Sequence, residues 1–407
     1  MTVEIPRKIV FLAPFGIRPK GTVLARMVPL AAELQTLASE VVIIAPPYTN
    51  PEDSGKVEEV RGVRLVNVEL PGGGKVVSTL LLVWRMFRAA LAERPDLVHL
   101  FKPKGYAGLA VMLMIFLRRI GVRMPPVVVD TDDWEGKGGM NELHPYSGAE
   151  RAVFEFQERW LLPNADAVTV ASRELEKMTG ELRGKRDALY LPNCVEQGGA
   201  GETTSMREKH GIPASAPVLL LYTRFFEFDQ ERLHDVFSRV RRLAPEVHFL
   251  VVGKGRRGEE AQLQEAAARL GFVSALHLAG WVEPAELPSY FAAADVAIYP
   301  FDDNLLNRCK CPAKLTELIR AAVPVVADRV GQVAEYVKDG ETGILCPPGD
   351  RECMATQVAG LLHDPQRRVA LGAAGRDYLL RDFSWQLFAP RLQQLYLQLL
   401  PSRQLFK

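Results

Sequence analysis

Short apolar runs alternate with longer amphipathic segments along almost the whole chain, and this alternation limits the folds that the chain can adopt. In the first half, strands are expected at 9–13, 41–45, 97–101, 127–130 and 167–171. Helical spacing marks the segments 22–38, 76–92, 106–120 and 149–162. Strands that alternate with helices in this way form βαβ units. The sequence therefore predicts an α/β fold with a doubly wound, mostly parallel sheet.

The pattern pauses between Pro192 and Pro217, where Gly, Ser, Thr and Pro replace large apolar side chains, as in a linker. Further strands are then expected at 218–222, 248–252, 275–278, 296–299, 324–327 and 343–346. Each half has the length of an ordinary domain. We therefore expect two Rossmann-like domains facing across a cleft. Their predicted bounds are 1–195 and 217–385, with a linker at 196–216 and a final helix, 386–407, that crosses back to the first domain.

Composition excludes several classes of protein. The 407 residues carry 50 Lys and Arg against 49 Asp and Glu, so the net charge of +1 gives no reason to expect a nucleic-acid partner. Five cysteines, an odd number, favour reduced thiols over a disulfide framework, and the Cys309–Cys311 spacing is unlike a zinc knuckle. The first residues lack the features of a signal peptide, and the most apolar run, 107–117, is too short to span a bilayer. A cytoplasmic protein is expected.

Two glycine-rich turns follow strand-like runs. The first, Gly16–Gly21, is close to P-loop spacing, but Lys20 precedes the second glycine where that motif requires a lysine after it. ATP hydrolysis is thereby rejected, and two interpretations stay open: an anion site at a helix start, or a plain turn. The second, Gly253–Gly258, reads G-x-G-x-x-G without the acidic residue that dinucleotide binding requires. A tight turn at the edge of the cleft is favoured there.

The segment 304–328 combines three basic residues, Arg308, Lys310 and Lys314, with a helix that Pro312 opens. Lys314 and Glu317 are three residues apart and so share a face of that helix. A helix N-terminus beside lysines suits a diphosphate, and a carboxylate one turn later suits the hydroxyls of a ribose. The alternative is an ordinary charged surface, because the neighbouring pair Asp302 and Asp303 would neutralise the cations.

The order and spacing of these and other motifs resemble the glycosyltransferases of the GT-B fold, specifically the large retaining group called family 4. The motifs are LPN at 191–193, YTRF at 222–225, FLVVGKG at 249–255, LAGWVEPAELPSYFAAADVAIYPF at 278–301, PAKLTELIRAAVPVVAD at 312–328, VGQVAEYVKDGETGILCPPGD at 330–350 and FSW at 383–385. The resemblance covers nearly the whole chain. It implies transfer of a hexosyl group from a nucleotide-sugar of the UDP or GDP type to a hydroxyl acceptor, with retention at the anomeric carbon.

The resemblance also implies roles for individual residues. Arg224 would contact the diphosphate, Glu317 the donor ribose, and the segment Gly280–Val282 would border the base. The nucleotide-sugar is then a co-substrate and no cofactor or metal is expected, because positive side chains and a helix N-terminus stabilise the leaving diphosphate. The predicted donor-binding residues are Gly16, Gly21, Arg224, Gly253, Val282, Lys310, Lys314, Leu315, Thr316 and Glu317. The predicted catalytic residues are Asp132, Arg224, Lys314 and Glu317.

The chain departs from the family pattern at three places. The family's E-x7-E motif would place its first Glu at position 309, where this chain has Cys309. The lysine that usually follows the arginine is missing after Arg224, and Lys310 and Lys314 would supply its charge, as in the branch with a P-x-K-L-x-E motif. Many relatives have a histidine where this chain has Asp132.

Polar residues at the ends of first-half strands are candidates for the acceptor side. Asp130, Asp132 and Asp133 close one strand, and substrate binding, loop capping and metal binding are the interpretations, in decreasing order of preference. His99 closes another strand and is either a cleft residue or a structural histidine. The predicted acceptor-side residues are His99, Lys102, Lys104, Asp132 and Trp134.

Two questions of partner and class stay open. Arg85 and Arg88 lie on an otherwise apolar helix, so either a peripheral contact with the cytoplasmic face of a membrane or an ordinary charged surface fits. The acceptor, a glycan, a lipid-linked molecule or a small molecule, is not identified. A retaining glycosyltransferase is the main hypothesis. The alternatives are a catalytically quiet GT-B protein that binds a nucleotide-sugar or a partner enzyme, and a nucleotide-sugar epimerase.

Overall fold

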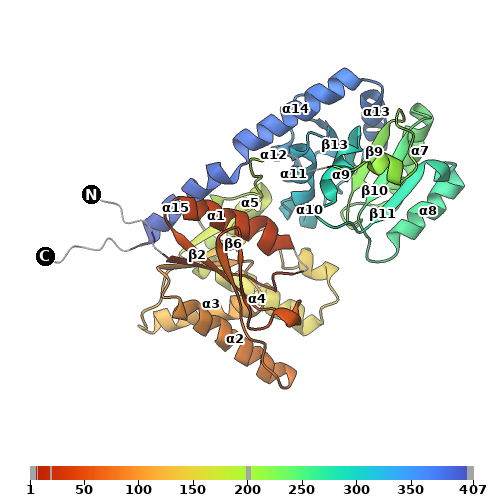
Figure 1. The fold of residues 1–407 in the computed structure, drawn as a ribbon. Helices are drawn as coiled ribbons and strands as arrows, with labels where there is room; N and C mark the ends of the chain where they lie inside the picture. The colour runs from red at the N-terminus through yellow and green to blue at the C-terminus, as the bar shows by residue number, and fades with distance from the viewer. Residues whose placement is uncertain (1–5, 7, 19–20, 199–202, 401–407) are drawn as a thin grey trace. The chain divides into compact units, whose positions relative to one another are not determined.

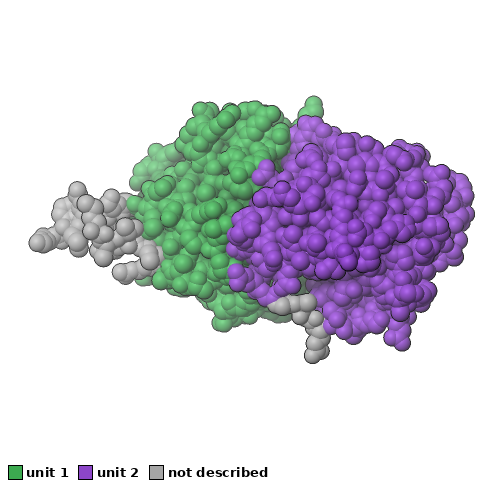
Figure 2. Space-filling view, turned by 90° about the horizontal axis from the view of Figure 1, so that it is seen from above, with its two compact units in different colours: residues 1–194, 309–311, 385–407 green, residues 195–308, 312–384 purple. Residues whose placement is uncertain are grey.

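The computed structural model describes residue 6 and residues 8–18, 21–198 and 203–400. The chain divides into two compact units, shown in green and purple in Figure 2. Unit 1 comprises residues 1–194, 309–311 and 385–407, and unit 2 comprises residues 195–308 and 312–384. The first described strand and the last helix therefore both belong to unit 1, together with a three-residue segment from the middle of the second half.

Unit 1 is built on an eight-stranded sheet with the order β3-β4-β2-β1-β5-β6-β7-β8. Its strands are β1 (Lys8–Leu12), β2 (Glu40–Ala45), β3 (Val57–Val60), β4 (Val63–Asn67), β5 (Leu97–Phe101), β6 (Val127–Thr131), β7 (Ala167–Val170) and β8 (Leu189–Tyr190). The edge strand β3 is antiparallel to β4, and the other neighbouring pairs are parallel. Strands β5 and β6 are buried along their whole length, as expected where helices cover both faces of a parallel sheet.

Helices cover the two faces of this sheet. They are α1 (Val28–Thr36), α2 (Lys75–Ala92), α3 (Gly105–Arg119), α4 (Gly148–Asn164), α5 (Arg173–Arg183) and α15 (Trp385–Leu399). Helices α1 and α15 pack together on one face, and α2, α3 and α4 lie on the other (Figure 1). The first predicted helix is irregular, because Val23–Met27 forms a π-helical turn before α1 begins.

Unit 2 is built on a parallel six-stranded sheet with the order β11-β10-β9-β12-β13-β14. Its strands are β9 (Val218–Tyr222), β10 (His248–Val252), β11 (Leu276–Gly280), β12 (Val296–Tyr299), β13 (Val325–Asp328) and β14 (Ile344–Cys346). Its helices are α6 (Met206–Lys209), α7 (Gln230–Leu243), α8 (Glu259–Leu270), α9 (Leu287–Ala292), α10 (Leu305–Cys309), α11 (Ala313–Arg320), α12 (Val333–Tyr336), α13 (Arg351–Leu362) and α14 (Pro365–Asp382).

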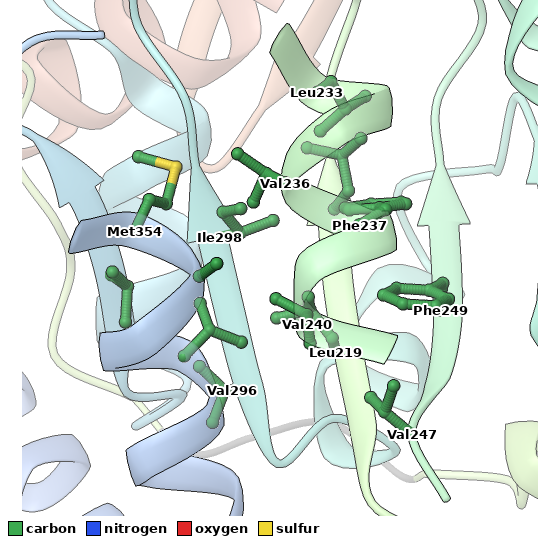
Figure 3. Packing of buried hydrophobic residues seen from close by; sticks show 14 of the residues in the cluster. Leu219, Leu233, Val236, Phe237, Val240, Val247, Phe249, Val296, Ile298 and Met354 are labelled. Atoms are coloured by element: carbon green, nitrogen blue, oxygen red, sulfur yellow. The ribbon is translucent and has the colours of Figure 1, made fainter. Parts of the chain in front are cut away.

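The core of unit 2 lies between the sheet and the helices α7 and α13 (Figure 3). Phe237 of α7 stacks on Phe249 of β10, with ring centroids 4.4 Å apart. Val236 of α7 lies beside Ile298 of β12, and Val240 lies beside Leu219 of β9 (Figure 3), since residues four apart share a helix face. The apolar side of α7 thereby packs on β9 and β10 as part of one buried core.

The two predicted Rossmann-like sheets are confirmed, and so is the α/β class. Sequence periodicity gave no sign of the β3–β4 hairpin. The predicted linker, 196–216, contributes α6, and Arg207 of that helix pairs with Asp295 of unit 2 at 2.7 Å. The predicted final helix, 386–407, corresponds to α15, which ends at Leu399, and its residues 401–407 lie outside the described residues.

In each sheet the strand order reverses once, between β1 and β5 in unit 1 and between β9 and β12 in unit 2. Loops leave such a point on opposite faces of the sheet, so a crevice forms at the carboxyl ends of the strands, and ligands of open α/β sheets bind there. This rule directs attention to the residues that follow β9, β10 and β12, and to those that follow β1, β5 and β6.

Candidate functional site

A small pocket opens at the carboxyl ends of β9 and β12 in unit 2. Its lining residues are Leu221, Tyr222, Thr223, Glu227, Phe228, Tyr299, Pro300, Phe301 and Lys314. The backbone turns sharply here, since Phe225 has a φ of +66°, which is unusual for a residue with a side chain. Gly253, at the end of the adjacent β10, has a φ of +130°, and a Cβ there would collide with the carbonyl oxygen of Thr223. A glycine is therefore required where the two strand ends approach.

Two arginines meet over one aromatic ring beside this pocket. Arg224 follows β9 and Arg256 follows β10, and their guanidinium carbons lie 5.2 and 5.1 Å from the centroid of the Phe226 ring. Half of the Arg224 side chain is exposed, and its Nε is 3.9 Å from a carboxylate oxygen of Glu227. Burial and then the nearby charge of Arg224 lower the pKa of Arg256. Two cations so close together favour an anionic ligand.

Helix α11 contributes a cation and a carboxylate to the same region. The Lys314 ammonium lies 3.2 Å from the centroid of the Tyr222 ring, and the Tyr222 hydroxyl is hydrogen-bonded to Glu317. The other carboxylate oxygen of Glu317, Oε2, is buried and has no hydrogen-bond partner. Burial raises the pKa of Glu317, although Lys314 acts in the opposite direction. A buried oxygen of this kind is an acceptor available to a ligand hydroxyl.

The G-x-G-x-x-G turn uses its backbone donors internally. Glu260 accepts from the Gly255 amide at 2.9 Å, and Glu259 accepts from the Arg257 amide at 2.6 Å. Two carboxylates therefore already accept from amides at the start of α8 that would otherwise be available to a dinucleotide phosphate. The preference for a tight turn over nicotinamide binding is thus consistent with the geometry, whereas the basic character of Arg256 was not recognised from the sequence.

The other predicted donor residues lie in different surroundings. Val282 follows β11 and is half-buried. Leu315 is fully buried, and the Thr316 hydroxyl donates to the carbonyl of Ala313 at 2.8 Å. Lys310 is buried in the segment 309–311, which belongs to unit 1.

The first glycine-rich turn belongs to unit 1. A Cβ on Gly16 would collide with the side chain of Asn50, so this glycine allows a close approach of two loops. Gly21 is exposed, with open space around it, and Lys20 lies outside the described residues.

The acidic run after β6 surrounds a lysine. Lys102 follows β5 with a φ of +63°, and its ammonium lies 2.7 Å from Asp132 and 2.6 Å from Asp133. Glu135 is 3.6 Å from the same ammonium and 2.5 Å from that of Lys104. The carboxylates outweigh burial, so the pKa of Lys102 is raised well above its usual value. A protein cation thus occupies the position that a metal would take between Asp132 and Asp133.

A second carboxylate network lies behind this cluster. Glu158 of α4 is fully buried and accepts from the backbone amides of Glu135 and Gly136 at 3.1 and 2.8 Å. Burial, reinforced by the charge of Glu135, raises the pKa of Glu158 to about 8. The indole of Trp134, also buried, donates to the carbonyl of Lys137 at 3.1 Å, which closes the loop.

Arg26 forms a network that was not predicted from the sequence. It lies on the π-helical turn and binds both carboxylate oxygens of Asp130, at 2.8 and 3.2 Å. It also donates to Asn193 of the LPN motif, whose side-chain amide in turn donates to the carbonyl of Cys311 at 2.6 Å. These bonds explain how the segment 309–311 is held in unit 1.

His99 is fully buried beside this network. Its Nδ1 lies 2.6 Å from the hydroxyl of Tyr396, and its Nε2 lies 3.3 Å from the hydroxyl of Thr169. Burial lowers the pKa of His99 to about 3, so the ring is neutral at physiological pH. Of the two interpretations that the sequence left open, the observed contacts are those of a structural histidine.

The structure brings Arg224, Lys314 and Glu317 together in unit 2, and Lys102, Lys104 and Asp132 together in unit 1. Arg308 fits the alternative of an ordinary surface charge, because it pairs with Asp303 at 2.5 Å. Sequence reasoning missed Arg256, Glu227, Tyr222 and Arg26. For Arg256 a signal existed, since it lies in the glycine-rich turn Gly253–Gly258, directly after the strand expected at 248–252.

Two negative findings concern the described residues only. No helix among residues 21–198 and 203–400 has the length and apolar character that crossing a membrane requires. Within the same ranges, no group of three or more His, Cys, Asp or Glu side chains is arranged to hold a metal ion.

Comparisons with known proteins fit this architecture. Residues 216–364 match the family described as Glycosyl transferases group 1, and residues 21–194 match the family described as Glycosyl transferase 4-like domain. Among solved structures, the Anabaena protein HepE in complex with UDP and glucose superposes with a TM-score of 0.71 at 18% identity, over 96% of this chain and 99% of that one.

Curated proteins with similar sequences include a mannosyltransferase and a glycogen synthase. A GDP-mannose-dependent alpha-(1-6)-phosphatidylinositol monomannoside mannosyltransferase of Mycolicibacterium smegmatis is 31% identical over 57% of this chain, an alignment that spans only 62% of that protein. A glycogen synthase of Mycobacterium tuberculosis is 26% identical over 90% of this chain and 89% of that protein.

Two Rossmann-like sheets, with a cationic pocket at the switch point of the second, define a GT-B glycosyltransferase fold. The two matched families together cover most of the chain. The chain belongs to the group 1 glycosyltransferases, also called family 4, which are retaining enzymes that use nucleotide-sugar donors.

Proposed function

We propose that the pocket of unit 2 binds the nucleoside diphosphate of a UDP- or GDP-linked sugar. Arg224, Arg256 and Lys314 would contact the diphosphate, and Glu317 would accept from the ribose hydroxyls. The observation that carries this proposal is the unpartnered Oε2 of Glu317 one helical turn from Lys314. Donor ligands of relatives differ: one relative is named GDP-mannose-dependent, and HepE was solved with UDP and glucose.

The same residues would also stabilise the diphosphate as it leaves the sugar. As the bond between the sugar and the diphosphate breaks, negative charge grows on the phosphate oxygens, and fixed cations stabilise that charge without reorganising. Lys314 lies in the first turn of α11 and lines the pocket, so the positive end of this helix dipole would add to the effect. A phosphate oxygen then receives the proton of the acceptor hydroxyl. We propose that the reaction proceeds in this way without a metal ion.

A thermal-shift screen tests the donor site. The purified protein is heated with UDP, GDP, ADP or dTDP, with and without EDTA. A ligand that binds only the folded state raises the Tm, and at 100 times its Kd it contributes about 2.7 kcal/mol of stability. We expect one of UDP and GDP to respond, equally well with EDTA. No response from any nucleotide would count against the proposal.

Variants locate the responding site. Arg224→Ala and Lys314→Ala should each weaken nucleotide affinity about tenfold or more, because each removes a charged contact with the diphosphate. Arg242→Ala is the matched control, since Arg242 is an exposed arginine near the carboxyl end of α7. Unchanged affinity in both site variants would exclude this assignment of residues.

We further propose that the acidic cluster of unit 1 receives the acceptor hydroxyl. Asp132 and Asp133 follow β6 at the carboxyl edge of the sheet, and both are largely buried beside Lys102. Carboxylates fixed in this way can orient a sugar or polyol hydroxyl. Asp132→Asn should lower kcat/KM at least tenfold while leaving the Kd of the nucleotide unchanged, as measured by initial rates and by calorimetry.

The apolar face of α2 supports a peripheral membrane contact for the proposed enzyme. Val76, Leu80 and Trp84 recur every four residues on this helix and are 73%, 66% and 48% exposed. Arg88 lies over the Trp84 ring at 5.9 Å, and Lys75 begins the helix. Exposed apolar side chains flanked by cations are typical of helices that lie in the surface of an anionic bilayer.

Vesicle sedimentation tests this contact. The double variant L80S/W84S should bind vesicles of phosphatidylglycerol and phosphatidylcholine about tenfold more weakly than the unmodified protein, because two apolar side chains no longer enter the bilayer. Val369→Ser is the control, because Val369 is 74% exposed on α14 of unit 2. Equal binding by all three proteins, or no binding at all, would count against a membrane contact through α2.

A further inference from the structure

Two cysteine thiols of unit 2 lie against each other outside the donor pocket. Cys346 is the last residue of β14, and Cys353 lies in the first turn of α13. Their sulfur atoms are 2.7 Å apart, with a thiol-to-thiol hydrogen bond between them. A disulfide bond is about 2.0 Å long. A displacement of well under 1 Å would therefore bring the two sulfurs to bonding distance.

The backbone fixes this approach through a short turn. After Cys346 the chain passes through two prolines to Gly349, whose φ of +79° is one that glycine adopts readily. Asp350 then caps α13 by accepting from the amide of Cys353 at 2.9 Å. The cap places the Cys353 side chain over the end of β14. The thiol pair thus results from ordinary turn and capping geometry and does not depend on long, flexible side chains.

The two thiols differ in accessibility. Cys346 is fully buried in the core of unit 2, whereas Cys353 packs against that core and is partly exposed. Burial, together with the hydrogen bond from Cys353, raises the pKa of the Cys346 thiol. A dissolved oxidant consequently meets Cys353 first, and Cys346 is positioned behind it as the resolving thiol.

We propose that Cys346 and Cys353 form a reversible intramolecular disulfide, a covalent modification site independent of glycosyl transfer. With a low-molecular-weight disulfide RSSR as oxidant, the Cys353 thiolate attacks one sulfur and releases RS⁻. The Cys346 sulfur, losing its proton, then attacks the Cys353 sulfur of the mixed disulfide and releases a second RS⁻. The protein loses two electrons and two protons, and RSSR is reduced to two RSH.

The bond would cross-link the turn beside the donor pocket. The Gly349 amide in this turn donates to Asp328 at 3.3 Å, and the other oxygen of Asp328 accepts from the amide of Phe301, a pocket residue, at 2.7 Å. Because little movement is needed, the native contacts persist and the cross-link mainly restricts the unfolded chain. We expect the oxidised protein to have a Tm about 5 °C higher than the reduced protein.

Peptide mapping tests the proposal directly. The full chain is incubated with oxidised glutathione, denatured, alkylated and cut with trypsin. Arg351 lies between the two cysteines, so trypsin places them on separate peptides, 339–351 and 352–367. The expected product is these two peptides joined by one disulfide, in a protein that stays monomeric on a non-reducing gel and reverts with dithiothreitol. Cys194, on the peptide 187–207, is the internal reference and should be recovered alkylated.

Two variants test whether the oxidation is specific to Cys346 and Cys353. Cys353→Ser should abolish the linked peptides and the rise in Tm, and Cys194→Ser should preserve both. The proposal is overturned if oxidation of the unmodified protein leaves Cys346 and Cys353 alkylated on separate peptides, or stops at glutathione on Cys353. A lower Tm for the linked form would also overturn it, because the bond would then require a distorted turn.

Discussion

The proposed donor site depends most on the side chain of Glu317. One of its carboxylate oxygens binds Tyr222, and the other, Oε2, has no hydrogen-bond partner. Glu317→Ala should weaken binding of the responding nucleotide by about 10- to 100-fold, since a hydrogen bond to a charged group contributes about 1.5–3 kcal/mol. Calorimetry with the nucleotide and its 2′,3′-dideoxy analogue checks the cause. The unmodified protein should discriminate between them, and the variant should not. Discrimination that survives in the variant would place the ribose elsewhere.

Glu158 makes the stability of unit 1 depend on pH. Its pKa of about 8 lies above the ordinary value of 4.5, so between these values the folded state holds a proton that the unfolded state has lost. Its contribution to stability is therefore complete below pH 4.5 and is lost as the pH rises through 8, by about 1.4 kcal/mol per unit. Urea denaturation of unit 1 from pH 5 to 9 should show this decline.

The variant Glu158→Gln should flatten that pH dependence, because an amide does not titrate. Glu150→Gln on the same helix is the matched control. The Ser147 amide and hydroxyl hold the pKa of Glu150 down at about 2, so this carboxylate stays ionised throughout the range. Its replacement should shift the curve without changing the slope. Parallel curves for all three proteins would show that Glu158 is not the group responsible.

For single residues, the sequence predicted positions along the chain better than contacts between side chains. Arg224, Lys314 and Glu317 were predicted because motifs fix residues at set distances along the chain. Their neighbours were not, because the stacking of Arg256 on the Phe226 ring and the bond from Tyr222 to Glu317 depend on how separate strands end in space. The Lys102 ion pairs were missed for the same reason: the lysine and the aspartates follow different strands.

The start of α5 helps to hold the distant segment 309–311 in unit 1, together with the bonds from Asn193. The Ser172 hydroxyl accepts from the amide of Leu175 at 3.2 Å and donates to the carbonyl of Cys309 at 2.8 Å. Ser172→Ala should lower the free energy of unfolding by about 2 kcal/mol, about half from the helix cap and half from the buried hydrogen bond. Urea denaturation followed by circular dichroism measures it.

The cap of α4 provides the comparison, because Ser147 is exposed and serves its own helix only. Ser147→Ala should cost about 1 kcal/mol, the value of an ordinary cap. An equal loss in the two variants would mean that the bond between Ser172 and Cys309 contributes nothing to stability.

The elements themselves were largely predictable, since buried parallel strands are short apolar runs and the helices between them show a 3.6-residue period. The β3–β4 hairpin was not, because its strand VEEV is polar and lies at the sheet edge, where burial leaves no pattern. The π-helical turn at Val23–Met27 was not predictable either, because its sequence, VLARM, has the apolar character of an ordinary α-helix. Nothing along the chain marks the segment 309–311 as part of unit 1, since its contacts come from residues more than 100 positions away.

The last helix, α15, returns to unit 1 and so brings together residues from opposite ends of the sequence. Tyr396 of α15 is fully buried and meets His99, which is 297 positions earlier, and α15 packs on α1. Tyr396→Ala leaves a cavity and removes this hydrogen bond, so unit 1 should lose about 3–5 kcal/mol of stability. Hydrogen exchange read by mass spectrometry should show reduced protection in β1, β5 and α1.

Peptides of unit 2 should keep their protection in this variant, although α15 follows unit 2 directly in the sequence. Each unit has its own sheet and its own buried core, and free energies of opening differ between such cooperative regions. Phe237→Ala, in the core of unit 2, should give the reverse pattern, with protection lost in β9 and β10. If Tyr396→Ala reduced protection equally in both units, the chain would unfold as one cooperative body. If the loss stayed within α15, the helix would be a peripheral addition and unit 1 would be complete without it.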